Sequence, residues 1–123
     1  MSDDLRHRLG RAGEEVAVAH LVRLGYEVVA RNHRTRFGEL DVVAFDGETL
    51  VFCEVKTRRA GPSASPWDAL GHGKRKQVRT MAAAWLAETT DRPYSAELRF
   101  DAIGVVFDAR GKLLALDHVE DAF

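Results

Sequence analysis

Residues 38–56 read GELDVVAFDGETLVFCEVK, and this stretch predicts two buried strands joined by a tight turn. Asp46-Gly47 is a typical hairpin turn signal between apolar segments. We therefore expect strands at 39–45 and 50–57. Both faces of each strand carry apolar residues, which is typical of strands that are covered on both sides.

The hairpin also carries charged side chains that period-two alternation gathers together. Glu39 and Asp41 share one face of the first strand, while Glu54 and Lys56 share a face of the second. A four-residue loop places Asp41 opposite Glu54 and leaves Glu39 opposite the lysine. A two-residue turn instead places Glu39 opposite Glu54. Both registers put the same charges on one patch.

Like charges that face each other destabilise a sheet, and unpaired charges in an apolar setting are costly. A divalent cation removes this conflict because Mg2+, or Mn2+ in its place, prefers carboxylate oxygens. The hairpin therefore predicts a metal site. The alternative is a surface ladder of ion pairs in which Lys56 neutralises Glu39 or Glu54.

Bulk composition places the chain among ordinary soluble proteins and predicts one domain over residues 1–123. Hydrophobic residues make up 46% and charged residues 30%, with a net charge of -1, so nucleic-acid binding would need a local basic patch. The single Cys53 excludes an intrachain disulfide and favours a cytoplasmic location. No stretch has the length and apolarity of a membrane span.

Working outward from the hairpin, apolar periodicity predicts an α/β protein with a central mixed β-sheet flanked by helices. The predicted segments are a helix at 4–24, a strand at 26–30, the hairpin, a helical turn at 67–70, a helix at 74–88, and strands at 98–107 and 113–119. Gly10, Gly13, Ala17, Leu21 and Leu24 form the expected buried stripe of the first helix, and Val78, Met81, Ala82, Trp85 and Leu86 that of the second.

Two further residues fit a metal site. Glu14 flanks the sheet-facing stripe of the first helix, as an extra ligand or as a boundary carboxylate paired with an arginine. Lys56 lies two residues beyond Glu54, where it can orient or help deprotonate an attacking water, or stabilise phosphate charge. The five histidines show no metal-ligand spacing, and His20 is expected to be a hydrogen-bonded helix residue.

A basic cluster surrounds the predicted site. Beside a metal site such a cluster suggests contacts to a phosphate backbone, and elsewhere it is typical of a solvated surface. Its members are Arg58, Arg59, Lys74, Arg75, Lys76 and Arg79.

In their order, these residues resemble the PD-(D/E)xK nuclease superfamily and, within it, the YraN-like family of small bacterial proteins. The motif reads as Asp41 on one strand, Glu54-Val55-Lys56 on the next, and Glu14 on the upstream helix. The resemblance spans nearly the whole chain and implies a restriction-endonuclease-like fold, similar to Holliday-junction resolvases. It also implies that Asp41, Glu54 and the Val55 carbonyl bind Mg2+, with Lys56 as catalytic lysine and Glu14 as an accessory acid.

The leading hypothesis is a Mg2+-dependent endonuclease that cleaves phosphodiester bonds in DNA, with branched or damaged DNA among the candidate substrates. The alternative is a nucleic-acid-binding module that keeps the nuclease fold without cleaving. Arg58, Lys74, Arg75 and Arg79 are the expected nucleic-acid contacts. The oligomeric state is left open, with a homodimer among the alternatives, and no membrane partner is expected.

Overall fold

The computed structural model describes residues 3–61, 72–95 and 97–123. Its elements, in chain order, are α1 (Asp3–Arg23), β1 (Glu27–Thr35), β2 (Gly38–Phe45), β3 (Thr49–Arg59), α2 (His72–Glu88), β4 (Glu97–Phe107) and β5 (Leu113–Val119). The strands form one five-stranded sheet in the order β1-β2-β3-β4-β5. Only β3 and β4 among these neighbours run parallel. The expected α/β class with a mixed sheet flanked by helices is confirmed, and it agrees with a restriction-endonuclease-like architecture.

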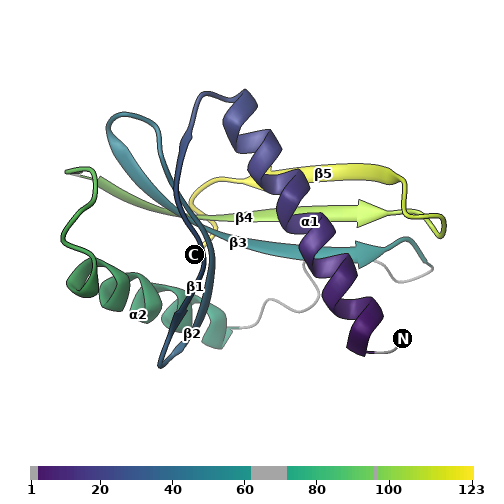
Figure 1. The fold of residues 1–123 in the computed structure, drawn as a ribbon, viewed down its shortest axis with the longest axis horizontal. Coiled ribbons are helices and arrows are strands. Elements are labelled where there is room, and N and C mark those ends of the chain that lie inside the picture. The colour runs from purple at the N-terminus through teal and green to yellow at the C-terminus, as the bar shows by residue number, and fades with distance from the viewer. Residues whose placement is uncertain (1–2, 62–71, 96) are drawn as a thin grey trace.

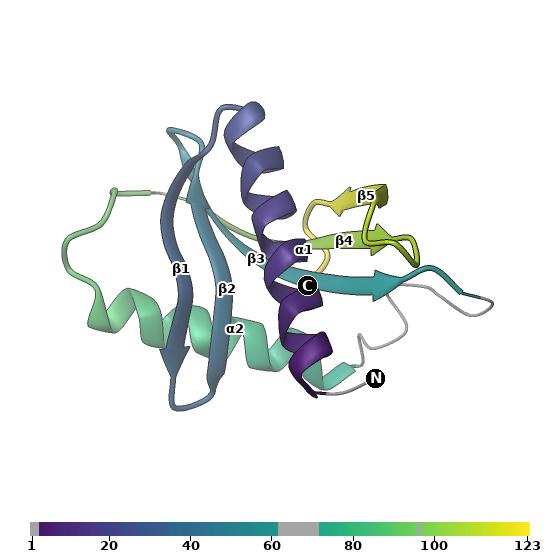
Figure 2. The same cartoon turned by 45° about the vertical axis from the view of Figure 1, so that its right-hand side comes forward.

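The two helices cover opposite faces of the sheet (Figures 1 and 2). On the α1 face, Ala17 and Leu21 join a buried cluster with side chains of β2, β3 and β4. On the α2 face, the buried stripe packs on the alternate residues of the same strands, with Trp85 edge-on to Phe52 at 5.8 Å between ring centroids. Both faces of the central strands are therefore buried under a helix, as their continuous apolar sequence predicts.

Two expectations about local structure were wrong. Leu24 was expected in the buried stripe, but it is 56% exposed. The helix has already ended at Arg23, and Gly25 takes the left-handed conformation (φ 94°) that closes many helices. The strand predicted at 26–30 continues to Thr35, whose hydroxyl shapes the following turn by accepting from the Phe37 N–H. The predicted helical turn at 67–70 lies outside the described residues.

The hairpin adopts the register of the longer loop. Phe45 pairs with Leu50, and the ladder continues up to Val42 opposite Cys53. Asp46 fixes the loop by accepting hydrogen bonds from the N–H groups of Glu48 and Thr49. This register puts Asp41 and Glu54 at the next position along, where pairing between β2 and β3 stops.

Gly13 sets how closely α1 approaches the sheet. A Cβ at this position would lie 1.8 Å from the Thr57 hydroxyl oxygen, so only glycine fits without a shift of the helix or the strand. The close approach brings the polar flank of α1 next to the end of the β2–β3 ladder. No described helix is both long and apolar enough to traverse a lipid bilayer.

Candidate metal centre

Asp41 bridges β2 and β3 at the point where main-chain pairing between them ends. Its Oδ2 accepts a hydrogen bond of 2.8 Å from the Val55 N–H. A side-chain carboxylate thus takes the acceptor role that a main-chain carbonyl has along the paired part of the ladder. The arrangement fixes the position of the carboxylate, because its partner belongs to the rigid central strand.

Three carboxylates from two elements converge at this position. Glu14 of α1 and Glu39 and Asp41 of β2 each offer an oxygen, and these oxygens all lie within 4.8 Å of one another. Oriented with its amide nitrogen toward them, Asn32 of β1 donates to Glu39 Oε1 at 3.1 Å and to Glu14 Oε1 at 2.9 Å. Asn32 is neutral, and the exposed Arg34, 3.5 Å from Glu39, is the one cation within ion-pair range of these three carboxylates among the described residues.

The crowding of acids changes their proton affinity. Burial, and next the charge of Glu54, raise the pKa of Asp41 to about 8, although the Val55 N–H and Lys74 oppose the rise. Burial and the charge of Glu39 also raise the pKa of Glu14, against the opposing effects of Arg31 and Asn32. Without a cation, the centre therefore tends to retain a proton at neutral pH.

Glu54 lies beside this group with its side chain only 5% exposed. Its Oε1 forms an ion pair of 2.5 Å with Lys74 Nζ of α2. Its Oε2 is buried and has no hydrogen-bond partner among the described residues. One oxygen of this carboxylate is therefore paired, while the other is desolvated without a hydrogen-bond partner, which is unfavourable unless another group binds it.

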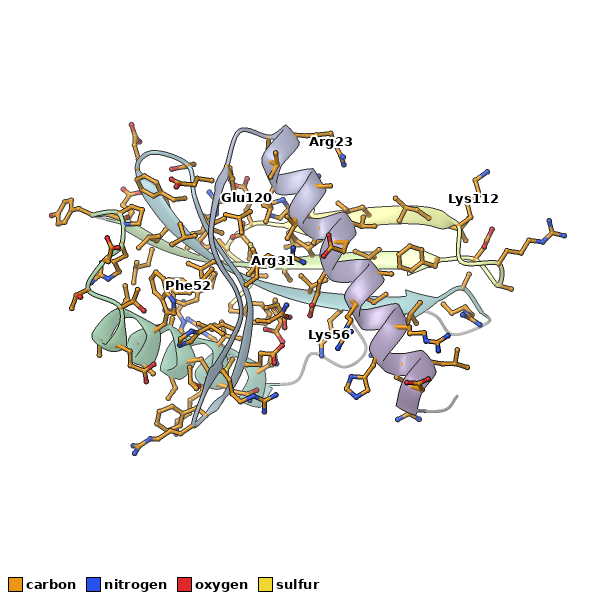
Figure 3. The ribbon with its side chains drawn as sticks, viewed as in Figure 1. Arg23, Arg31, Phe52, Lys56, Lys112 and Glu120 are labelled. Atoms are coloured by element: carbon orange, nitrogen blue, oxygen red, sulfur yellow. The ribbon has the colours of Figure 1, made fainter. Side chains whose placement is uncertain are left out.

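Lys56 does not form the ion pair expected by the ladder alternative, since no described carboxylate lies in salt-bridge range of it. The lysine is partly buried, and with Glu14 it lines a cavity of about 340 Å³ between α1 and β3. In the view of Figure 3, its side chain lies between β2 and the N-terminal half of α1. Its ammonium group is thus available to a ligand that enters this cavity.

Comparison with known proteins shows to which family this chain belongs. The model of a family described as "Uncharacterised protein family UPF0102" matches residues 13–105. The chain belongs to the UPF0102 family. A UPF0102 protein of Parafrankia sp. (strain EAN1pec) is 46% identical over 94% of this chain and 96% of its own length. Another, from Nitratidesulfovibrio vulgaris (strain DP4), is 43% identical over 98% of this chain and 87% of its own length.

The UPF0102 match agrees with the YraN-like resemblance of the sequence, and the matched range contains every acid of the centre together with Lys56 and Lys74. A family and a fold do not by themselves define an activity. The function of this UPF0102 protein must therefore be inferred from the chemistry of its site.

The predicted basic cluster of the UPF0102 chain is divided by the fold. Lys74 is held by Glu54, and the exposed Arg75 lies on α2. Arg79 donates to the main-chain oxygen of Phe123 at 2.7 Å, and its guanidinium lies 4.5 Å from the centre of the Phe100 ring. Arg58 borders the cavity that Lys56 lines. The cluster is thus not one continuous surface around the carboxylates.

A second buried carboxylate, which the sequence did not single out as a site, lies on the other side of β3, where Asp101 of β4 pairs with Cys53. Asp101 of β4 is fully buried and accepts two hydrogen bonds of 2.9 Å from Arg99. It also binds His118 Nε2 at 2.8 Å and accepts from the Asp121 N–H at 3.1 Å. These donors lower the pKa of Asp101 even though its burial acts in the opposite direction.

The same network ties α1 to the sheet. His118 Nδ1 lies 3.0 Å from Nε2 of His20, which confirms that His20 is a hydrogen-bonded helix residue. Nε2 of His118 contacts the Asp101 carboxylate, and the ring tautomers decide which histidine donates in the hydrogen bond between His118 and His20. Burial, the neighbouring His118 and Arg23 lower the pKa of His20. Sequence spacing could not reveal this pair, since 98 positions separate its members.

Proposed function

We propose that this UPF0102 protein is a divalent-metal-dependent nuclease that hydrolyses phosphodiester bonds in DNA. One observation carries the proposal: three carboxylates, Glu14, Glu39 and Asp41, converge at the open end of a buried hairpin. Beside them, Glu54 Oε2 is buried without a partner among the described residues. An all-oxygen donor set of this charge suits Mg2+ or Mn2+. Burial first, and then neighbouring carboxylates, raise the pKa of Asp41 and of Glu14, and a bound cation would offset both effects.

The residues that would hold the ion are Asp41 and the free oxygen of Glu54, with Glu14 and Glu39 as direct or water-mediated ligands. The Val55 carbonyl completes the set that the family resemblance implies. When bound, Mg2+ or Mn2+ supplies the Lewis acidity that polarises a phosphoryl oxygen and lowers the pKa of water. Oxygen ligands fixed by β2, β3 and α1 would hold that chemistry in one place.

The chain's own residues then provide orientation and proton handling. Lys56 lines the cavity beside Glu14, where its ammonium can hold an attacking water or stabilise negative charge on the phosphate. Lys74 orients Glu54 through its 2.5 Å contact. Asn32 holds Glu14 and Glu39 in place by donating to both carboxylates. The apolar cover of both sheet faces keeps bulk water away from the buried side of the site.

The test is a cleavage screen over linear, nicked, flapped and four-way DNA with Mg2+, with Mn2+ and with EDTA. We expect cleavage by the wild type that EDTA abolishes, and a loss of at least about 100-fold in Asp41→Asn and Lys56→Ala. Arg8→Ala is the matched control, because Arg8 lies on α1, pairs with exposed Asp4 and lines neither cavity beside the site. Equal cleavage by wild type and Asp41→Asn would refute the proposal.

The Glu54–Lys74 ion pair favours a second candidate. Because an ammonium already occupies one oxygen of the expected ligand, the fold is also compatible with a nucleic-acid-binding module that does not cleave. Salt-sensitive DNA binding without metal-dependent turnover on any substrate of the screen would favour this module over the nuclease.

A further inference from the structure

We propose that the UPF0102 chain docks the phosphate backbone of double-stranded nucleic acid along α1 and β1, rather than along the basic residues of α2. The surface consists of two adjoining cavities beside the N-terminal half of α1, which we call the arginine groove. The inference rests on the proposed function, since it names the substrate form and the docking surface of that same site.

The larger cavity, of about 720 Å³, lies between α1 and the first two strands. Glu14 and Glu39 of the candidate centre line it. Its basic lining comes from two elements, with Arg6 and Arg11 on α1 and Arg31 and Arg34 on β1. A ligand lying in this cavity would therefore touch guanidinium groups and the candidate carboxylates at the same time.

The smaller cavity, of about 340 Å³, continues on the other side of Glu14. Arg6, Gly10 and Glu14 line both cavities, so the two hollows adjoin along one stretch of α1. Lys56 and Arg58 belong to the smaller one. A Cβ added at Gly10 would meet nothing within 4 Å, so the space above this shared stretch is open. Positive groups thus extend to both sides of the carboxylates, as a continuous backbone requires.

The four arginines of the groove differ in whether they already pair with a carboxylate of the protein. Arg31 binds Glu15 at 2.6 Å, and the outer Arg34 lies 3.5 Å from Glu39. Arg6 and Arg11 are exposed and have no ion pair or hydrogen bond among the described residues. Phosphate oxygens accept strong, often bidentate hydrogen bonds from guanidinium groups, so these two arginines are the free partners for a backbone.

The lining also indicates which form of nucleic acid would fit. Among the described residues that line the two cavities there is no Phe, Tyr or Trp. Proteins that bind single strands use exposed aromatic rings on which bases stack. A groove lined by several arginines, with His7 as its one aromatic ring among the described residues, contacts mainly phosphates, which fixes register without reading sequence. This favours duplex over single-stranded nucleic acid.

The basic residues of α2 offer a weaker alternative. Arg75, Lys76 and Arg79 border a separate hollow on the helix that covers the opposite face of the sheet. No carboxylate of the candidate centre lines that hollow. Arg79 is already engaged by the main-chain oxygen of Phe123. Backbone bound there would contact α2 without entering the groove that the candidate catalytic residues line.

Two double variants of α1 test the inference. Arg6→Ala with Arg11→Ala removes two charges inside the groove. Arg8→Ala with Arg23→Ala removes two charges from the same helix outside it, and Figure 3 shows Arg23 at the far end of α1. All four side chains are exposed, so neither variant disturbs the core. Equal loss of net charge makes the comparison insensitive to the overall field of the protein.

The measurement is fluorescence anisotropy with a short labelled duplex and its single strand, in EDTA to prevent turnover, over a range of salt. We expect the groove variant to bind duplex about tenfold more weakly, with a salt slope lowered by about 0.9 for each phosphate that an arginine no longer neutralises. The control variant should stay close to wild type, and wild type should prefer duplex. Equal weakening in both variants, preference for the single strand, or no duplex binding by wild type would overturn the inference.

The two proposals fail separately. Duplex binding that depends on the groove, without metal-dependent cleavage, would refute the nuclease and keep the docking surface. Metal-dependent cleavage that the groove variant retains at wild-type rate and affinity would refute the docking surface and keep the nuclease.

Discussion

Asp41 and Asp101 are two aspartates in apolar strands of one sheet, and their pKa values move in opposite directions. Burial raises the pKa of both, but Arg99, His118 and the Asp121 N–H outweigh it at Asp101. Asp41 receives one N–H hydrogen bond and faces other carboxylates. The comparison distinguishes a completed structural network from a cluster of carboxylates that lacks such a set of donors among the described residues, as the proposed cation site would require.

The largest effect is expected from breaking the completed network. Asp101→Asn should lower the free energy of unfolding by about 3–5 kcal/mol, because Arg99 and His118 lose the buried carboxylate that pairs with them. Chemical denaturation followed by circular dichroism measures the change. In the folded fraction, Mn2+ affinity should stay close to wild type. A loss of Mn2+ affinity without a loss of stability would reverse the roles given to the two aspartates.

Removing Lys74, which pairs with Glu54, sharpens the contrast between the Asp101 network and the candidate metal centre. Lys74→Met should destabilise the metal-free protein by about 3 kcal/mol, because Glu54 is left buried without a partner. Added Mn2+ should then raise the melting temperature more in this variant than in wild type, since the ion replaces the lost charge. The same Mn2+ shift in both proteins would show that Glu54 takes no part in metal binding.

Alanine substitutions at Gly13 and Gly10 test how closely α1 packs against β3. Gly13→Ala should lower the free energy of unfolding by about 1–3 kcal/mol, because the added methyl group meets Thr57 and separates the helix from β3. Gly10→Ala, three residues earlier, points into open space and should stabilise α1 by about 0.5–1 kcal/mol. Thermal melts of the two variants provide the comparison, and equal melting temperatures would contradict the close approach at Gly13.

The pH dependence of stability isolates Asp41. Its pKa is about 8 in the folded protein against an ordinary value of 3.8, so between these values the folded state holds a proton that the unfolded chain has released. Stability from this group is therefore complete at low pH and declines as pH rises toward 8, by up to about 1.4 kcal/mol per unit. The free energy of unfolding of Asp41→Asn should therefore rise relative to that of metal-free wild type by about 2–3 kcal/mol between pH 5 and pH 7. A constant difference across this range would contradict the raised pKa.

The sequence predicted the parts of this picture that depend on local period. Alternation placed Asp41 and Glu54 on neighbouring strands, and the Asp46-Gly47 turn limited the register to two choices. Helical spacing correctly separated half-buried Glu14 from exposed Glu15. These features follow from one or two residues of context, which the sequence contains.

Contacts between residues far apart in the chain could not be predicted from the sequence in this way. Lys74 reaches Glu54 from a helix on the far face, and His118 meets Asp101 and His20 across β5 and α1. Asn32, with its left-handed φ of 50°, had no signal beyond the tolerance of asparagine for that conformation. The arginine groove combines residues of separate elements, so no basic run in the sequence marks it.

Metal binding in solution tests the central claim most directly. Isothermal titration of metal-free wild type with Mn2+ at neutral pH should show one saturable site per chain, weakened at least about tenfold in Asp41→Asn and unchanged in the Arg8→Ala control. Absence of saturable binding, or equal affinity in wild type and Asp41→Asn, would contradict the claim that the carboxylates around Asp41 form a cation site.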